Sequence, residues 1–153
     1  MEDYEGRMKK LGLCIPEIPP VAGAYVPAVK SGNLVFCSGQ GAYKDGSQIY
    51  VGQVGTDIPL ESAYQAARIA ALNCLAEIQS VIGSLNRISR IVQIRGFVNS
   101  ARSFHDQPKV VNGASELMLE IFGDAGKHAR CALGTNNLPG NIPVEVEMVV
   151  EFE

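Results

Sequence analysis

The C-terminal segment "VEVEMVVEFE" alternates apolar and acidic side chains, and this pattern constrains the fold more than any other in the chain. The apolar set is Val144, Val146, Met148, Val150 and Phe152, and the acidic set is Glu145, Glu147, Glu151 and Glu153. A period of two is typical of a β-strand with one buried face. The segment therefore predicts a strand in a sheet that is covered on one side.

Two longer segments have the period of an α-helix. Start and stop signals flank both, namely Asp57, Pro59 and Gly83 for the first, and Asp106, Pro108 and Gly123 for the second. The first helix is predicted over residues 60–82, with a stripe of Ala63, Ala67, Ala70, Ala71, Cys74, Ile78 and Val81. The second has a core face of Val110, Val111, Ala114, Leu117, Met118, Ile121 and Phe122. The alanine stripe favours close packing of the first helix against a sheet.

The remaining strands set the order of elements. A hairpin is predicted from residues 25–29 and 34–38, joined by the turn residues Ser31-Gly32-Asn33. Further strands are expected in "SQIYVGQVG", in "RISRIVQIRGFVN", where Val92, Ile94 and Val98 alternate with Gln93 and Arg95, and in "RCALGT". This order predicts an α+β domain over residues 1–153, in which both helices pack on one face of a mixed sheet.

Residues 1–19 precede this pattern as an N-terminal extension, in which "DYEGRMKKLGL" predicts a short helix with Met8 and Leu11 facing inward. The chain offers no third layer for the second face of the sheet. An uncovered sheet face favours oligomerisation.

Composition and charge exclude several classes of protein. Apolar residues make up 46% and charged residues 19%, so the chain is globular rather than disordered. The net charge is −3, which argues against a nucleic-acid surface. Without a membrane-spanning stretch or a signal-peptide pattern, the sequence predicts a cytoplasmic protein with reduced, mostly buried cysteines. The spacing of Cys and His predicts no metal site, and the glycines match no phosphate-binding or dinucleotide-binding motif.

Arg130 begins the predicted strand "RCALGT", shortly before a Pro-Gly turn. On the residues alone it is either a solvated charge at a strand end or a binding site for an anion. A guanidinium binds a planar carboxylate through two parallel hydrogen bonds, so a small carboxylate is the ligand it would fit best.

Several motifs together resemble the RidA/YjgF family of reactive-intermediate deaminases, formerly called L-PSP endoribonucleases. The resemblance runs from about Pro20 to Glu153 and is carried by "GAYVPAV", "GNLVFCSGQ", "VNGASELMLEIFG", "HARCALGTNNLP" and "VEVE". It implies a chorismate-mutase-like fold and a homotrimer, in which three sheets form a central barrel and the active sites lie in clefts between subunits.

The resemblance also implies a function: the hydrolysis of small enamines and imines such as 2-aminoacrylate to 2-keto acids and ammonia, without a cofactor. Carried over by position, the family's carboxylate-binding arginine falls on Arg130 and its water-orienting glutamate on Glu145. Substrate contacts fall on Tyr25, Gly39 and Asn112, and Cys131, the residue after the arginine, is a further candidate for contact with the substrate. A small-carboxylate-binding or regulatory trimer without catalysis and an RNA-cleaving enzyme are the alternatives.

The sequence departs from the family two residues after the arginine, where many active members have cysteine or threonine and this chain has Ala132. Strand alternation predicts that Cys131 faces away from Arg130. Simpler structural roles remain open for the other residues: a solvated strand face for Glu145, strand packing for Tyr25, and a local helix hydrogen bond for Asn112.

Overall fold

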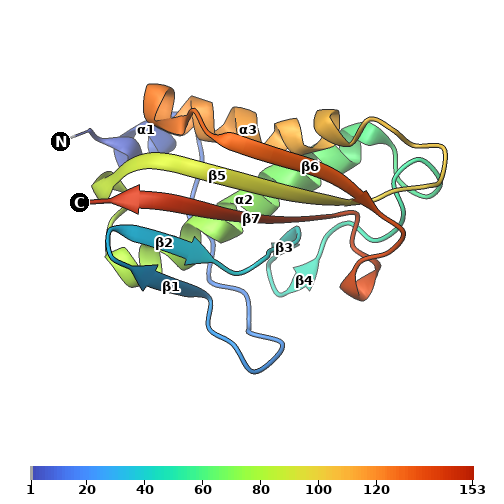
Figure 1. Cartoon of the computed structure of the whole chain (residues 1–153), viewed down its shortest axis with the longest axis horizontal. Coiled ribbons are helices and arrows are strands. Elements are labelled where there is room, and N and C mark those ends of the chain that lie inside the picture. The colour runs from blue at the N-terminus through green and yellow to red at the C-terminus, as the bar shows by residue number, and fades with distance from the viewer. Residues whose placement is uncertain (1) are drawn as a thin grey trace.

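The computed structural model describes residues 2–153 (Figure 1). The helices are α1 (Tyr4–Lys10), α2 (Leu60–Ile82) and α3 (Gln107–Phe122), and short 3₁₀ turns cover Leu85–Arg87, Gly123–Gly126 and Pro139–Asn141. The strands are β1 (Ala28–Ser31), β2 (Leu34–Cys37), β3 (Tyr43–Lys44), β4 (Ser47–Gln48), β5 (Ile88–Asn99), β6 (Ala129–Thr135) and β7 (Val144–Phe152).

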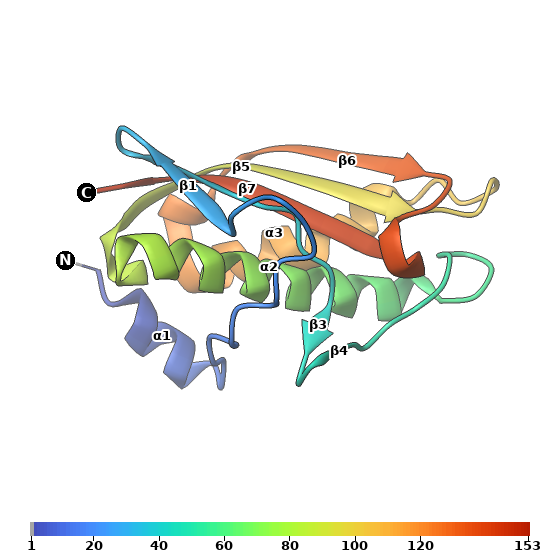
Figure 2. The ribbon, with the colours of Figure 1, turned by 90° about the horizontal axis from the view of Figure 1, so that it is seen from below.

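Five strands form one mixed sheet in the order β1-β2-β7-β5-β6, and β3 pairs with β4 in a separate hairpin. Only β5 and β6 run parallel in the large sheet, because α3 connects them as a crossover. Both long helices lie on the same face of this sheet (Figure 2). The predicted α+β architecture is therefore confirmed.

Small residues allow α2 and α3 to approach the sheet and each other. Ala63, Ala67, Ala70 and Ala71 of α2 are fully buried. A Cβ on Gly113 of α3 would stand 2.1 Å from a backbone oxygen of α2, and a Cβ on Gly96 of β5 would stand 2.4 Å from Val111. The seven residues predicted for the core face of α3 are all buried. The expected helix boundaries are confirmed, and so are the expected faces except at Val81 of α2, which is only half-buried.

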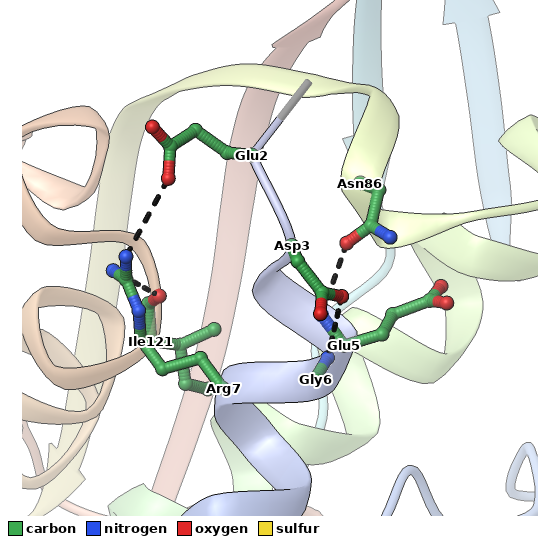
Figure 3. A network of polar contacts seen from close by, with 7 residues as sticks. All are labelled: Glu2, Asp3, Glu5, Gly6, Arg7, Asn86 and Ile121. Carbon is green, nitrogen blue, oxygen red and sulfur yellow. Dashed lines mark hydrogen bonds and ion pairs between the residues drawn. The ribbon is translucent and has the colours of Figure 1, made fainter.

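The N-terminal helix α1 packs beside the ends of α2 and α3 (Figures 2 and 3). The Asp3 side chain accepts a hydrogen bond from the Gly6 amide at 2.8 Å and caps α1. The Arg7 guanidinium donates to the Ile121 carbonyl in the last turn of α3 at 2.9 Å, where the helix dipole favours a cation. Met8 is buried as expected, but Leu11 is exposed because α1 ends at Lys10.

Two strand boundaries differ from the prediction. β1 begins at Ala28 rather than Tyr25, because Pro27 has no amide hydrogen to donate to a ladder. In "SQIYVGQVG" only Ser47–Gln48 forms a strand, since the loop that follows turns through left-handed conformations at Gly52 and Gly55.

In β5 the pairing with β7 shifts register between Ile91 and Gln93. This bulge changes the side-chain alternation, so Ile91 is buried and Val92 is only half-buried. The cysteines also divide differently from the expectation, since Cys37 and Cys74 are buried whereas Cys14 and Cys131 are exposed.

The face of the sheet opposite the helices is uncovered within the chain, and we call it the open face. Its exposed apolar side chains are Val29, Phe36 and Leu133, each about half exposed. Arg95 of β5 and Glu147 of β7 form an ion pair on the same face. The expectation that a single chain leaves one sheet face bare is confirmed.

Candidate functional site

Arg130 lies on β6, the edge strand that pairs only with β5. It stands opposite Ile94, a fully buried core residue, so its side chain is on the helix face of the sheet. Its Nη1 donates to Asn112 Oδ1 at 2.7 Å and to Ser115 Oγ at 3.2 Å, both on α3. The structure thus brings together Arg130 and Asn112, two residues that the sequence placed in one site.

The remaining donors of Arg130 have no partner among residues 2–153. The described hydrogen bonds use Nη1 alone, and no described carboxylate forms an ion pair with this half-buried guanidinium. A partly desolvated cation is costly unless an anion balances it. The edge formed by Nε and Nη2 has the geometry that binds a carboxylate through two hydrogen bonds.

Two further residues complete this group, and the sequence analysis did not identify them. Ser115 Oγ lies 2.9 Å from His128 Nε2, and His128 Nδ1 lies 2.6 Å from the Gly126 carbonyl. Asn112 and Ser115 are three residues apart on α3, a spacing that places both on one helix face. We call Arg130, Asn112, Ser115 and His128 the arginine half-site.

Glu145 lies on β7 between Val144 and Val146, which both face the helices, so its side chain is on the open face. Burial raises the pKa of the Glu145 carboxyl, and the neighbouring charge of Glu147 raises it further. A raised pKa is the direction of shift that suits a carboxyl acting as a general acid or base. Glu145 is half-buried rather than fully solvated.

Gly39 lies directly beside Glu145. A Cβ on Gly39 would stand 2.9 Å from Glu145 Cδ, so any larger residue would displace the carboxyl group. The next residue, Gln40, fixes this approach, because its backbone amide and carbonyl both pair with Val146 at 2.8 Å. We call Glu145, Gly39 and Gln40 the glutamate half-site.

A buried acid on α2 supports the glutamate half-site and was missed by sequence analysis. Gln40 Nε2 donates to Glu77 Oε1 at 2.6 Å, and Glu77 is only 1% exposed. Its other carboxyl oxygen is buried without a hydrogen-bond partner in the described chain. Burial raises the pKa of Glu77 to about 8, against the opposing effect of the Gln40 hydrogen bond. Glu77 is therefore predominantly protonated at neutral pH.

Tyr25 and Cys131 lie outside both half-sites. Tyr25 is on the exposed loop before β1, where its hydroxyl accepts a hydrogen bond from the Ala22 amide at 3.4 Å. Cys131 pairs in register with Arg95 and is exposed. As predicted from strand alternation, Cys131 faces away from Arg130. His128, three residues before Cys131, hydrogen-bonds to Ser115.

The two half-sites lie on opposite faces of the same sheet. The helix face carries Arg130, and the open face carries Glu145, so one chain alone does not bring the guanidinium and the carboxyl together. Among residues 2–153, no group of three histidine, cysteine, aspartate or glutamate side chains could hold a metal ion. No helix in this part of the chain is long and apolar enough to cross a membrane.

Comparison with known proteins identifies the family. The family model "YjgF/chorismate mutase-like, putative endoribonuclease" matches residues 5–152. Protein TCP17 of Trypanosoma cruzi is 39% identical over 146 residues, which cover 95% of this chain and 91% of that protein. A 2-iminobutanoate/2-iminopropanoate deaminase of Dermatophagoides farinae is 30% identical over 138 residues, which cover 90% of this chain and 93% of the mite protein.

Solved structures of similar sequence have the same fold as this chain. A protein of unknown function from Agrobacterium tumefaciens is 40% identical and superimposes with a TM-score of 0.90, covering 98% of this chain and 93% of its own. A candidate endoribonuclease from Shewanella oneidensis is 36% identical with a TM-score of 0.95, covering 99% of this chain and 100% of its own. The chain therefore belongs to the YjgF/chorismate mutase-like family and has the fold of that family.

Proposed function

We propose that the protein hydrolyses small 2-imino acids and their enamine tautomers to 2-keto acids and ammonia. The observation that carries this proposal is the half-buried Arg130, whose free donor edge has no carboxylate partner within the described chain. The mite relative named as a 2-iminobutanoate/2-iminopropanoate deaminase supports the same substrate class. Such substrates are small and carry one carboxylate next to the reacting C=N bond.

Each half-site supplies one part of the chemistry. Arg130 binds the substrate carboxylate through its free edge and thereby fixes the position of the imine carbon. Glu145 takes a proton from a water molecule as its oxygen adds to that carbon, and the C=N bond becomes a C–N single bond. Glu145 then returns this proton to the nitrogen. It next transfers the hydroxyl proton of the resulting 2-amino-2-hydroxy acid to the same nitrogen, so the C–N bond breaks, ammonia leaves, and the C=O bond of the keto acid forms. Oxidation states do not change, so the reaction requires no redox cofactor.

A second copy of the chain would complete the site. Because the half-sites lie on opposite sheet faces, we propose a homotrimer in which Arg130 of one copy meets Glu145 of its neighbour. The exposed apolar residues of the open face, Val29, Phe36 and Leu133, would be buried in this assembly. Tyr25 and Cys131 are proposed to approach the substrate from the same cleft.

The assembly is expected to sediment as a single species near three times 16.4 kDa at micromolar concentration. Burial of the open face provides the physical reason, since an uncovered apolar sheet face is costly in water. Analytical ultracentrifugation over a tenfold concentration range measures this. A monomer at all concentrations would exclude both the barrel and a site shared between subunits.

Activity is tested by generating 2-aminoacrylate in situ and following keto-acid release above the spontaneous rate. The variants Arg130→Ala and Glu145→Gln are each expected to be inactive. When the two are unfolded together and refolded at equal concentration, about a quarter of the parental rate is expected, because random mixing pairs an intact arginine with an intact neighbouring glutamate at that frequency. Each variant refolded alone is the control.

The outcomes of this assay distinguish the alternatives. If the parent is active but the mixture of the two variants recovers no activity, the proposal of a site shared between subunits is wrong. Saturable keto-acid binding without turnover in the parent would instead support a carboxylate-binding or regulatory trimer. RNA cleavage, the activity in the family's name, is disfavoured by the net charge of −3, since nucleic-acid surfaces are normally basic.

A further inference from the structure

The arginine half-site contains a continuous chain of hydrogen bonds behind Arg130. It runs from Arg130 Nη1 to Ser115 Oγ at 3.2 Å, from Ser115 Oγ to His128 Nε2 at 2.9 Å, and from His128 Nδ1 to the Gly126 carbonyl at 2.6 Å. Ser115 is only 8% exposed, and His128 is half-buried. These groups are therefore partly shielded from water, which would otherwise replace their mutual hydrogen bonds.

The chemistry of the two ends fixes the direction of this chain. A guanidinium can only donate, and a carbonyl oxygen can only accept. His128 must therefore carry a proton on Nδ1 to donate to Gly126. In the neutral ring Nε2 then has a free lone pair, so the Ser115 hydroxyl donates to it. The Ser115 oxygen in turn accepts from Arg130, so the two middle groups, Ser115 and His128, both donate and accept.

Two members of the hydrogen-bond chain, Ser115 and Gly126, are held by α3 and the turn that ends it. Ser115 lies within α3, and Gly126 closes the 3₁₀ turn that follows it. A Cβ on Gly126 would stand 2.3 Å from the Met118 carbonyl, so this turn packs against α3 more closely than any other residue permits. The Gly126 carbonyl is thus a fixed acceptor, and it sets the orientation of the His128 ring.

We propose that Ser115 and His128 are positioning residues that act on the substrate through Arg130. Together with Asn112 they hold Nη1, which orients the guanidinium plane and leaves its Nε–Nη2 edge free for the carboxylate of a 2-imino or 2-keto acid. The inference rests on the proposed role of Arg130 in binding that carboxylate. Ser115 is not the nucleophile in this arrangement, because it is buried and its oxygen accepts a hydrogen bond from a cation.

The test uses pyruvate as the probe and calorimetry on the assembled protein. Ser115→Ala removes the link between Arg130 and His128, so pyruvate affinity is expected to fall about tenfold, the equivalent of one hydrogen bond. His128→Leu is expected to do the same, because Ser115 then loses its acceptor. His128→Gln offers a carbonyl oxygen to Ser115 and is expected to restore most of the affinity. Ser80→Ala, an exposed helical serine on α2, is the matched control.

Nitrogen-15 NMR of the His128 ring gives a readout that general loss of stability would not move. The parent is expected to show the Nδ1–H tautomer, and the Nε2 resonance is expected to shift when pyruvate is added. The same addition should leave Nε2 unchanged in Ser115→Ala. The titration of the parent needs no variant, so the presence or absence of a shift at Nε2 tests the inference even if Ser115→Ala fails to fold.

The failure of this inference is distinguishable from failure of the proposed function. If Arg130→Ala abolishes pyruvate binding while Ser115→Ala and His128→Leu bind like the parent, the positioning role is wrong and the carboxylate site stands. The absence of any pyruvate-induced change at Nε2 in a parent that binds pyruvate would likewise overturn the inference. If Arg130→Ala binds pyruvate as tightly as the parent, the proposed carboxylate site at Arg130 is itself wrong.

Discussion

Replacing Arg130 with alanine is expected to abolish keto-acid binding and imine hydrolysis while leaving the fold and assembly intact. A bound carboxylate would accept two charge-assisted hydrogen bonds from the guanidinium, each of which stabilises the complex by about 1.5–3 kcal/mol. Their loss corresponds to at least about a hundredfold weaker binding. The side chain lies on an edge strand and is only half-buried, so its truncation should cost the core little. Calorimetry with pyruvate or 2-ketobutyrate measures the loss.

Two variants make this experiment specific. Arg130→Lys keeps the positive charge but loses the planar pair of donors, and lysine cannot bind Asn112, Ser115 and a carboxylate in the same geometry. It is therefore expected to be severely impaired as well. Arg102→Ala removes an exposed arginine from the loop before α3 and is expected to bind like the parent. Parental affinity in Arg130→Ala would show that Arg130 is an ordinary surface charge at the end of a strand.

Local patterns in the sequence were sufficient to predict the main helices and the faces they bury. α2 and α3 begin and end within a residue of the predicted positions, because helical periodicity and the flanking Pro and Gly signals agree. The alternation of β7 also predicted which face is covered. The register shift in β5 was not predictable, because a bulge depends on how two strands pair and leaves no composition signal in either one.

The site was predicted less completely than the fold. Arg130 and Asn112 were identified through the family resemblance, and in the structure Arg130 Nη1 lies 2.7 Å from Asn112 Oδ1. Ser115 and His128 lie on either side of the turn that follows α3, so no helical or strand periodicity in the sequence indicates that they meet. Glu77 was detectable in principle, since an acidic residue occupies a position next to Ile78 on the apolar stripe of the first helix. Arg130 and Glu145 lie on opposite faces of the sheet. This depends on the register in which β6 and β7 pair with β5, as well as on the alternation of side chains within each strand.

The second large expected effect is a pH dependence of the protein's stability, and it arises from Glu77. Its carboxyl is buried between α2 and the sheet, and burial raises its pKa to about 8 from an ordinary value near 4.5. Between these two pH values the folded protein keeps a proton that the unfolded chain releases. Stability therefore falls as the pH rises through this window, because the unfolded state binds fewer protons there. The full loss is about 3–5 kcal/mol per chain by pH 8.

Glu77→Gln is expected to remove this pH dependence. The glutamine carbonyl can still accept the hydrogen bond from Gln40, and the side chain has nearly the same shape but cannot ionise. At pH 5 the variant should be slightly less stable than the parent, because its amide places unpaired N–H donors where the second carboxyl oxygen lay. At pH 8 the variant should be the more stable of the two. The two stability curves are thus expected to cross between pH 5 and pH 8.

Chemical denaturation of both proteins at pH 5, 6, 7 and 8 and at one protomer concentration tests this, since an oligomer's stability depends on concentration. Glu17→Gln, a change at an exposed glutamate of the N-terminal segment, controls for the loss of one negative charge and should follow the parent at every pH. Parallel curves for Glu77→Gln and the parent would mean that Glu77 ionises normally in the folded protein. A crossing would show that Glu77, which accepts a hydrogen bond from Gln40, keeps its proton in the folded protein.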